Sequence, residues 1–285
     1  MIRVSKRLPC PICQKPDWCL VAEGGAAAIC KRVKSDHLVG TKDAGWLHKL
    51  RDDRDSYYQS VSHPKTVRPE QPQRDWPPLA ERYQRAMTDP GYRHLASELE
   101  LSVDSLRRLQ VGWDGSKSAS TWPMRNADGV VVGIRTRTGN GKRAIGGTDG
   151  NGLIFDPAGL TPDYLLICEG PTDTAALLDS GFDSVVGRPS CRGDTVNIIS
   201  IIERLRPAAV LLIPDRDEAG LSGFGELAAA IASSGCIELH RIDAITPPEG
   251  INDTRQWAQK NRDHLSGRIA ASLENINQRT ETSND

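Results

Sequence analysis

The second half of the chain alternates short apolar segments with helix-length segments, and this alternation limits the folds available to it. Apolar segments cover 164–168, 183–187, 208–214 and 237–243, and segments of helical character cover 171–180, 194–205 and 219–234. Short buried strands that alternate with helices form a parallel sheet with helices on both faces. The sequence therefore predicts an α/β domain over 161–257, with a mostly parallel sheet flanked by helices.

Acidic residues directly follow two of these predicted strands. Glu169 comes after the first strand, and Asp215 and Asp217 come after the third, in IPDRDEAG. Ligands of such sheets gather beyond the carboxyl ends of the strands, so the three carboxylates converge if the strands are neighbours. Burying a carboxylate is costly unless a cation compensates it, and carboxylates without His or Cys select a hard cation. We therefore predict a Mg²⁺ or Mn²⁺ site at this edge.

Two further acids are candidates for the outer part of the same site. Asp173 follows Glu169 by four residues, and Asp253 lies in PEGINDTRQW after the last predicted strand. Each also has a simpler explanation, because Asp173 falls in the first turn of a predicted helix and Asp253 is suited to capping one.

Four of the seven cysteines are crowded near the N-terminus. Cys10 and Cys13 form a two-residue knuckle, and Cys19 and Cys30 lie on two predicted strands joined through a Gly-containing turn. Four clustered cysteines in a chain without a signal peptide favour structural zinc over disulfides, and free thiols are the remaining alternative. The sequence predicts a zinc-ribbon-like β module over residues 1–50. The spacing leaves open that a histidine, His37 or His48, replaces one sulfur.

Basic and aromatic residues surround this cysteine cluster. Lys31 and Arg32 follow the last cysteine, and Trp18 precedes the third. Such residues contact phosphates and stack on bases in nucleic-acid-binding proteins. Packing over a very small core is an equally good explanation for Trp18. The other three cysteines (Cys168, Cys191 and Cys236) lie among apolar or small residues, where buried small side chains are expected.

The middle of the chain divides into a linker and a basic subdomain. Residues 51–78 are charged, contain prolines and lack periodicity, which is typical of an extended linker. Residues 79–160 predict a small α+β subdomain, with helices up to residue 110 and Ser102 as an N-cap, followed by two strands around the 127–129 turn. Arg135 and Arg137 would share one face of the second strand, and Lys142 and Arg143 follow in a Gly-rich loop. These cations either bind template and nucleotide or form the solvated side of a sheet.

Charge is distributed unevenly along a chain whose net charge is only −1. Residues 1–50 hold nine Lys and Arg against four acids, and residues 151–285 hold eleven against twenty. A basic N-terminal part and an acidic C-terminal half fit a protein that binds a polyanion along the first and a cation in the second. Charged residues on an ordinary solvated surface would give the same counts. The sequence shows neither a signal peptide nor a membrane span, so we expect a cytoplasmic protein. Residues 258–285 read as a polar tail, helical or disordered.

The acidic motifs carry a resemblance to a known family. Glu169-Gly170 with Asp173, followed by Asp215-Arg216-Asp217, resembles the Toprim domain of bacterial-type primases, topoisomerases, small nucleases and recombination proteins. The preceding strand pair and the N-terminal cysteine module stand in the same order as the parts of bacterial-type DNA primases. The cysteine spacing is more similar to a phage or mobile-element version. The chain departs from the family at Asn252, where a Lys often precedes the last Asp, and in the GRPSC loop at 187–191.

The resemblance implies an enzyme that makes RNA primers on single-stranded DNA. It implies metal-binding acids at Glu169, Asp215 and Asp217, supported by Asp173 and Asp253, and a basic groove formed by Arg135, Arg137, Lys142 and Arg143. Nucleoside triphosphates and single-stranded DNA template are the implied substrates, and a separate replicative helicase is the implied partner, because the sequence has no phosphate-binding loop of a helicase motor. A Toprim-type nuclease and a non-catalytic zinc- and DNA-binding regulator are the alternatives. The sequence leaves open whether ribonucleotides or deoxyribonucleotides are used.

Overall fold

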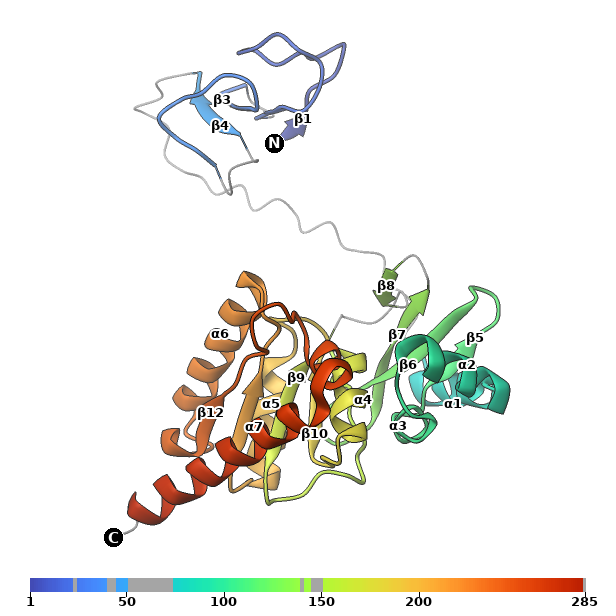
Figure 1. Cartoon of the computed structure of the whole chain (residues 1–285). Helices are drawn as coiled ribbons and strands as arrows, with labels where there is room; N and C mark the ends of the chain where they lie inside the picture. Colours follow the sequence, from blue (N-terminus) through green and yellow to red (C-terminus); the bar gives the residue numbers. More distant parts are fainter. Residues whose placement is uncertain (23–24, 40–44, 51–73, 139–140, 145–150, 284–285) are drawn as a thin grey trace. The chain divides into compact units, whose positions relative to one another are not determined.

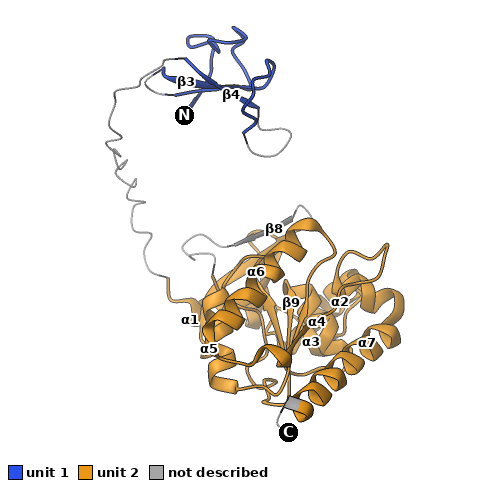
Figure 2. Ribbon diagram, turned by 90° about the vertical axis from the view of Figure 1, so that its left-hand side faces the viewer, with its two compact units in different colours: residues 1–68 blue, residues 69–285 orange. Residues whose placement is uncertain are grey.

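The computed structural model describes residues 1–22, 25–39, 45–50, 74–138, 141–144 and 151–283 of the 285-residue chain. The chain divides into two compact units, residues 1–68 and 69–285 (Figure 2). Most of the expected linker, residues 51–73, lies outside the described residues. Every helix in the described part of the chain is too short or too polar to cross a lipid bilayer.

The first unit is a small antiparallel sheet. Its strands are β1 (Ile2–Arg3), β2 (Leu20–Val21), β3 (Ala27–Cys30) and β4 (Trp46–Lys49), and they pair in chain order. The buried cluster of this unit consists of Val4 and three cysteine side chains, Cys10, Cys19 and Cys30, with Ile12 and Cys13 packed against it. A core of this size buries too little apolar surface to stabilise a fold alone.

The second unit begins with three helices and an antiparallel sheet (Figure 1). The helices are α1 (Trp76–Ala86), α2 (Asp89–Leu99) and α3 (Val103–Arg108). As predicted, Ser102 caps α3, and its hydroxyl accepts a hydrogen bond from the Ser105 N–H. The sheet pairs β5 (Gly112–Asp114), β6 (Ala119–Arg125), β7 (Val131–Thr138) and β8 (Gly141–Ala144) in that order. The expected strand pair around the 127–129 turn is therefore present as β6 and β7.

The rest of the second unit is the predicted parallel sheet flanked by helices. In chain order it contains β9 (Leu165–Glu169), α4 (Pro171–Asp179), β10 (Val185–Arg188), α5 (Thr195–Leu205), β11 (Val210–Ile213), α6 (Glu218–Ser234), a 3₁₀ turn (Leu239–Arg241), β12 (Ile242–Ala244) and α7 (Thr254–Ser283). The strands are all parallel, in the order β10-β9-β11-β12. The order places β9 and β11, which precede the candidate acids, side by side.

Alternate residues of the parallel strands pack into two different cores. Leu165 and Ile167 of β9 face the cluster that contains α5 and α6 residues such as Ile201 and Phe224. Leu166 and Cys168 face the other cluster, which contains residues of α4 and α7. A strand buried on both faces in this way reads as a continuous apolar run, which explains the sequence of residues 165–168.

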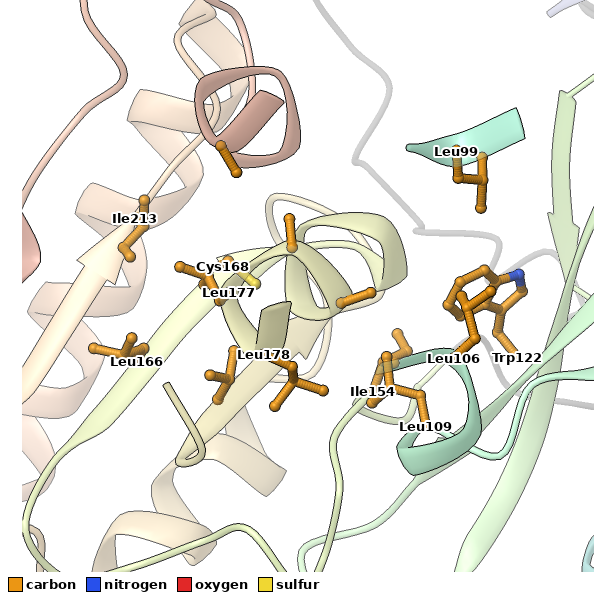
Figure 3. Close-up of a cluster of buried hydrophobic side chains, with 14 of the residues drawn as sticks. Leu99, Leu106, Leu109, Trp122, Ile154, Leu166, Cys168, Leu177, Leu178 and Ile213 are labelled. Carbon is orange, nitrogen blue, oxygen red and sulfur yellow. The ribbon is translucent and has the colours of Figure 1, made fainter. Parts of the chain in front are cut away.

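The second of these cores extends without a break into the antiparallel part of the unit. It also contains Leu99, Leu106 and Trp122, as well as Ile154 (Figure 3). Residues 153 and 154 connect the two sheets directly, because Leu153 bridges to Arg125 and Ile154 bridges to Gly187. The subdomains that the sequence separates at residue 160 therefore share one hydrophobic core.

Three sequence-based boundaries differ from the structure. Helix α1 starts at Trp76, inside the expected linker 51–78. Prolines are tolerated at its first positions because the N–H groups of the first helical turn have no helical acceptor, so their loss costs no hydrogen bond. Residues 258–283 are helical, which is one of the two states expected, but they are not a separate tail. They continue α7, which kinks at Asn261, and bury Leu265, Ile269 and Ile276. The strand expected over 237–243 is reduced to Ile242–Ala244, since the 3₁₀ turn takes its first half and leaves Leu239 69% exposed.

Gly187 on β10 allows a close approach between β10 and the start of α4. A Cβ atom at this position would lie 2.1 Å from the Thr174 Oγ1 and 2.7 Å from the Gly170 carbonyl oxygen. We expect Gly187→Ala to lower the free energy of unfolding by about 1–3 kcal/mol, because a packed backbone must move. Gly225→Ala is the control, since that position in α6 has open space, and it should raise stability by about 0.4–1 kcal/mol. Urea titrations measure both, and equal stabilities would contradict this packing.

Candidate active site

The neighbouring strands β9 and β11 bring the first candidate acids to one edge of the sheet. Ile213, the last residue of β11, pairs with Cys168, and Glu169 is the last residue of β9. Asp215 follows two residues after Ile213 and so stands beyond the same carboxyl end. The Arg216 N–H donates a 2.7 Å hydrogen bond to the Asn252 carbonyl oxygen, which holds the segment before α7 against this edge.

Asp215 lies at the centre of the acidic group. Its pKa is raised from 3.8 to about 8, first by burial and then by the charges of Asp173, Glu169, Asp253 and Asp217, in that order. The five carboxylates predicted from the sequence therefore lie close enough to interact electrostatically. Within the described part of the chain, no donor reaches the buried Oδ1 of Asp215. This oxygen is available to a ligand.

Three of the other acids accept hydrogen bonds from backbone N–H groups. Asp217 caps α6 and accepts a 2.6 Å hydrogen bond from Gly220, and Asp253 accepts one of 2.6 Å from Gln256 in the first turn of α7. Asp173 is only 3% exposed, and its Oδ1 accepts a 2.8 Å hydrogen bond from the Arg255 N–H. The capping roles that the sequence offered as the simpler explanation are thus present for Asp253, and Asp173 does lie in the first turn of α4. Neither role excludes a second one at the acidic edge.

Arg135 and Arg137 of β7 are both half-buried, but they have different surroundings. Arg135 donates a hydrogen bond from Nη1 to the Pro189 carbonyl oxygen, in the loop after β10. Burial lowers the pKa of Arg135, and the charge of Glu169 opposes this shift. Burial also lowers the pKa of Arg137, which interacts with Asp173 and Asp253. The β7 arginines therefore border the acidic edge.

Two other predicted cations of this region, Lys142 and Arg143, lie on β8 rather than in a loop. Their backbone pairs with Arg137 and Thr136 of β7. A Gly-rich sequence was expected to form a loop, but the pairing continues the antiparallel sheet by one strand. Their side chains lie outside the described part of the structure.

Arg188, at the end of β10, shapes the loop that follows it. Its side chain is 1% exposed and donates hydrogen bonds to the carbonyl oxygens of Gly193, Cys191 and Gly223. Its guanidinium also lies 5.2 Å from the centre of the Phe224 ring. The Arg188 side chain therefore holds the 189–193 loop in place and does not face a ligand. The same loop accepts the hydrogen bond of Arg135 at the Pro189 carbonyl oxygen. Arg192 is exposed and pairs with Glu226.

In the first unit, the four N-terminal cysteines form one cluster. Their sulfur atoms all lie within 4.8 Å of one another, and Cys19 Sγ is 3.7 Å from Cys13 Sγ and 3.9 Å from Cys30 Sγ. The backbone N–H groups of Lys31 and Val33 donate to Cys19 and Cys30, as is common for thiolates. Although burial opposes it, hydrogen bonds from Lys15, Cys10 and Arg32 lower the pKa of Cys13 to about 6.

The four-cysteine cluster is formed without either candidate histidine. The ring Nε2 of His48 lies 3.1 Å from the Val33 carbonyl oxygen, and neither His37 nor His48 belongs to the cluster. Trp18 is 73% exposed, so it does not pack over the core of the unit. Trp18, Lys31 and Arg3 line a surface groove of ≈ 550 Å³. Arg32 is anchored beside it by a 2.6 Å ion pair with Asp17.

Over 68% of its length, the chain is similar in fold to DnaG primase catalytic cores. A structure of the DnaG catalytic core has a TM-score of 0.54 and 18% identity, covering 68% of this chain and 77% of that chain. The DnaG primase catalytic domain bound to ssDNA has a TM-score of 0.54 and 20% identity, covering 68% of this chain and 76% of that chain. The Aquifex aeolicus primase with its zinc-binding and RNA polymerase domains has a TM-score of 0.52 and 14% identity, covering 72% and 64%. No protein-family model matches the chain, and no curated protein matches it.

One residue beside the site was missed by the sequence analysis. Arg255, in the first turn of α7, donates its backbone N–H to Asp173 and lies close enough to Arg137 for their charges to interact. Its position two residues after Asp253 was the available signal, but only the packing of α7 against α4 brings it to the acidic edge.

Proposed function

We propose that this chain is a DNA primase, a nucleotidyltransferase that synthesises short RNA primers on single-stranded DNA. One observation carries the proposal: at the carboxyl edge of the parallel sheet Asp215 interacts electrostatically with four further carboxylates, and the fold around this edge is similar to that of primase catalytic cores. The structure of a primase catalytic domain bound to ssDNA supports single-stranded DNA as the template. We assign the second unit's parallel sheet to the Toprim type on its Glu169-Gly170 and Asp215-Arg216-Asp217 motifs.

The oxygen donors at the acidic edge have the chemistry that a divalent cation requires, whereas among the described residues the four cysteines are the group whose ligand atoms already lie within 4.8 Å of one another. Carboxylate oxygens are the ligands that Mg²⁺ and Mn²⁺ prefer, and an accessible cation would remove the cost of ionising Asp215. Glu169, Asp215 and Asp217 would hold the metal, with Asp173 and Asp253 beside them. When bound, the metal supplies charge that stabilises a reacting triphosphate and lowers the pKa of an attacking 3′-hydroxyl.

The basic residues of β7 and β8 would hold the nucleic acid and the nucleotide beside these acids. Arg135 and Arg137 lie on β7 and interact electrostatically with the acids, and Lys142 and Arg143 lie on the neighbouring strand β8. Cations at this border attract phosphates that the carboxylates alone would repel. A side chain fixed by the Pro189 carbonyl, as Arg135 is, keeps its charge in position without rearrangement.

We assign structural zinc to Cys10, Cys13, Cys19 and Cys30. Tetrahedral coordination with Zn–S distances of about 2.3 Å places the sulfur atoms about 3.8 Å apart. The Cys13–Cys19 and Cys19–Cys30 separations of 3.7 and 3.9 Å agree with this geometry. The module would present Trp18 for stacking on template bases, and Lys31 and Arg32 for phosphate contacts.

The cysteine spacing indicates which version of bacterial-type primase this chain resembles. The spacing of the second cysteine pair supports a phage or mobile-element version, and a separate replicative helicase is the expected partner. We propose five parts: the zinc module 1–50, a linker that ends before α1, a basic subdomain from Trp76 to residue 160, the Toprim domain 161–257, and the remainder of α7 from residue 258, which packs on the core.

The experiment is primer synthesis by the whole chain on random single-stranded DNA. We expect short RNA products that require Mg²⁺ or Mn²⁺ and nucleoside triphosphates, and much less product with deoxynucleoside triphosphates. Parallel reactions on end-labelled DNA without nucleotides test for cleavage. Cleavage without synthesis would make the protein a Toprim-type nuclease, and neither activity with intact DNA binding would make it a regulator.

A further inference from the structure

Arg255 has a side chain whose position its hydrogen bonds do not explain. The Nη1 group donates one long hydrogen bond, 3.4 Å, to the Leu99 carbonyl oxygen. The Nε group is buried and, among the described residues, has no acceptor. Burying a guanidinium donor without an acceptor is costly, so this geometry favours a ligand that supplies one.

Arg137 approaches the same place from β7. Its position is fixed by pairing with Ser120 of β6 and Lys142 of β8. Burial lowers the pKa of Arg137, and the charge of Arg255 lowers it further, so the two guanidinium groups lie within range of electrostatic interaction. Two cations held together in a half-buried place repel each other unless an anion lies near both.

The nearest carboxylates do not fill this role. Neither Arg137 nor Arg255 makes a salt bridge with any carboxylate of the described chain, which sets them apart from Arg108 and Arg192. Glu98, Asp173 and Asp253 interact with Arg137 without forming a salt bridge. Glu98 is exposed, and Asp173 and Asp253 each already accept a hydrogen bond from a backbone N–H of α7. The guanidinium N–H groups of Arg137 and Arg255 can therefore donate hydrogen bonds to a bound anion.

We propose that Arg255 and Arg137 together form a seat for the phosphates of the incoming nucleoside triphosphate. The inference rests on the proposed primase function and adds Arg255 as a nucleotide-positioning residue. The planar guanidinium groups match phosphate oxygens in pairs. A triphosphate is favoured over a DNA phosphodiester because it carries more negative charge and can chelate a divalent cation beside the acids through several oxygens.

The test measures binding of inorganic tripolyphosphate to the whole chain by calorimetry, with Mg²⁺ present. We expect Arg255→Gln and Arg137→Gln each to weaken binding by roughly tenfold or more, because each removes charge-assisted hydrogen bonds. The double variant should lose less than the product of the two effects, since both residues hold one anion. In primer synthesis both single variants should raise the KM for nucleotide more than they lower kcat. Arg268→Gln, on an exposed position of α7, is the matched control and should change neither.

Several outcomes would overturn the seat. Unchanged tripolyphosphate affinity in Arg255→Gln, at the wild-type melting temperature, contradicts it. Weakened binding of single-stranded oligothymidine with unchanged tripolyphosphate affinity would assign the pair to the template instead. If Arg255→Gln fails to fold, Arg137→Gln decides by the same measurements.

The design separates this inference from the primase proposal. Primer synthesis with an unchanged nucleotide KM in both variants would contradict the phosphate site and leave the primase proposal unaffected. Arginine-dependent tripolyphosphate binding by a wild-type chain that makes no primers keeps the seat and removes the primase.

Discussion

Replacing Asp215 with asparagine is expected to abolish primer synthesis, with a loss of roughly 10³-fold or more, because about 4 kcal/mol of metal-held charge stabilisation would be removed. The asparagine keeps the size of the side chain, so the sheet edge should remain folded. Asp163→Asn, at an exposed position before β9, is the control and should retain activity. Gel analysis of labelled primers measures both. Full synthesis by Asp215→Asn would remove this residue from the catalytic centre.

The same substitution should stabilise the protein in the absence of divalent cations. The pKa of Asp215 is about 8 in the folded chain, raised by burial and by four neighbouring carboxylates, against 3.8 in the reference state. Between these values the folded protein keeps a proton that the unfolded protein releases, so stability falls as pH rises from about 4 to about 8. Asp215→Asn lacks this titration. Its melting temperature in EDTA, relative to wild type, should therefore increase from pH 5 to pH 8, and a difference independent of pH would contradict the raised pKa.

Loss of the cysteine site is expected to unfold the first unit and leave the second unit intact. Structural zinc contributes about 10–16 kcal/mol in small modules, and here the buried cluster consists mainly of the cysteine side chains themselves. In Cys19→Ser, or in wild type with a strong chelator, amide hydrogens of residues 1–50 should exchange rapidly while those of β9 and β11 stay protected. Hydrogen exchange and metal analysis measure this.

The control for the zinc site is a cysteine outside the cluster. Cys236 is half-buried near the end of α6 and belongs to the second unit. Cys236→Ser should retain one zinc per chain and full protection of the first unit. Retention of zinc and of protection by Cys19→Ser would show that this sulfur is not a ligand.

The parallel sheet could be predicted because its signals are local and strong. Each buried strand is a continuous apolar run, and the acids follow these runs directly, so the strand ends were visible in the sequence. The condition that remained open, whether β9 and β11 are neighbours, is a matter of topology. The observed order β10-β9-β11-β12 satisfies it.

The features that the sequence did not reveal depend on contacts between distant segments. Residues 258–283 are polar overall, and only the spacing of Leu265, Ile269 and Ile276 gives them a buried face. Arg255 reaches the acidic edge because α7 packs against α4, more than 80 positions away in the chain. Pro77 and Pro78 favoured an extended linker in the sequence, although prolines are well tolerated in the first turn of a helix.

The bridges of residues 153 and 154 determine where this protein can be cut into pieces. A fragment that ended near residue 160 would expose Trp122 and Leu106, and the complementary fragment would expose Leu166 and Leu177, since all four belong to a single cluster. Both pieces would be prone to aggregation. Among the described residues, each hydrophobic cluster lies within one of the two units, 1–68 or 69–285. Chimeric proteins that join two related chains between residues 68 and 69 should therefore fold. Chimeras joined near residue 160, at the border of the two sheets, should not.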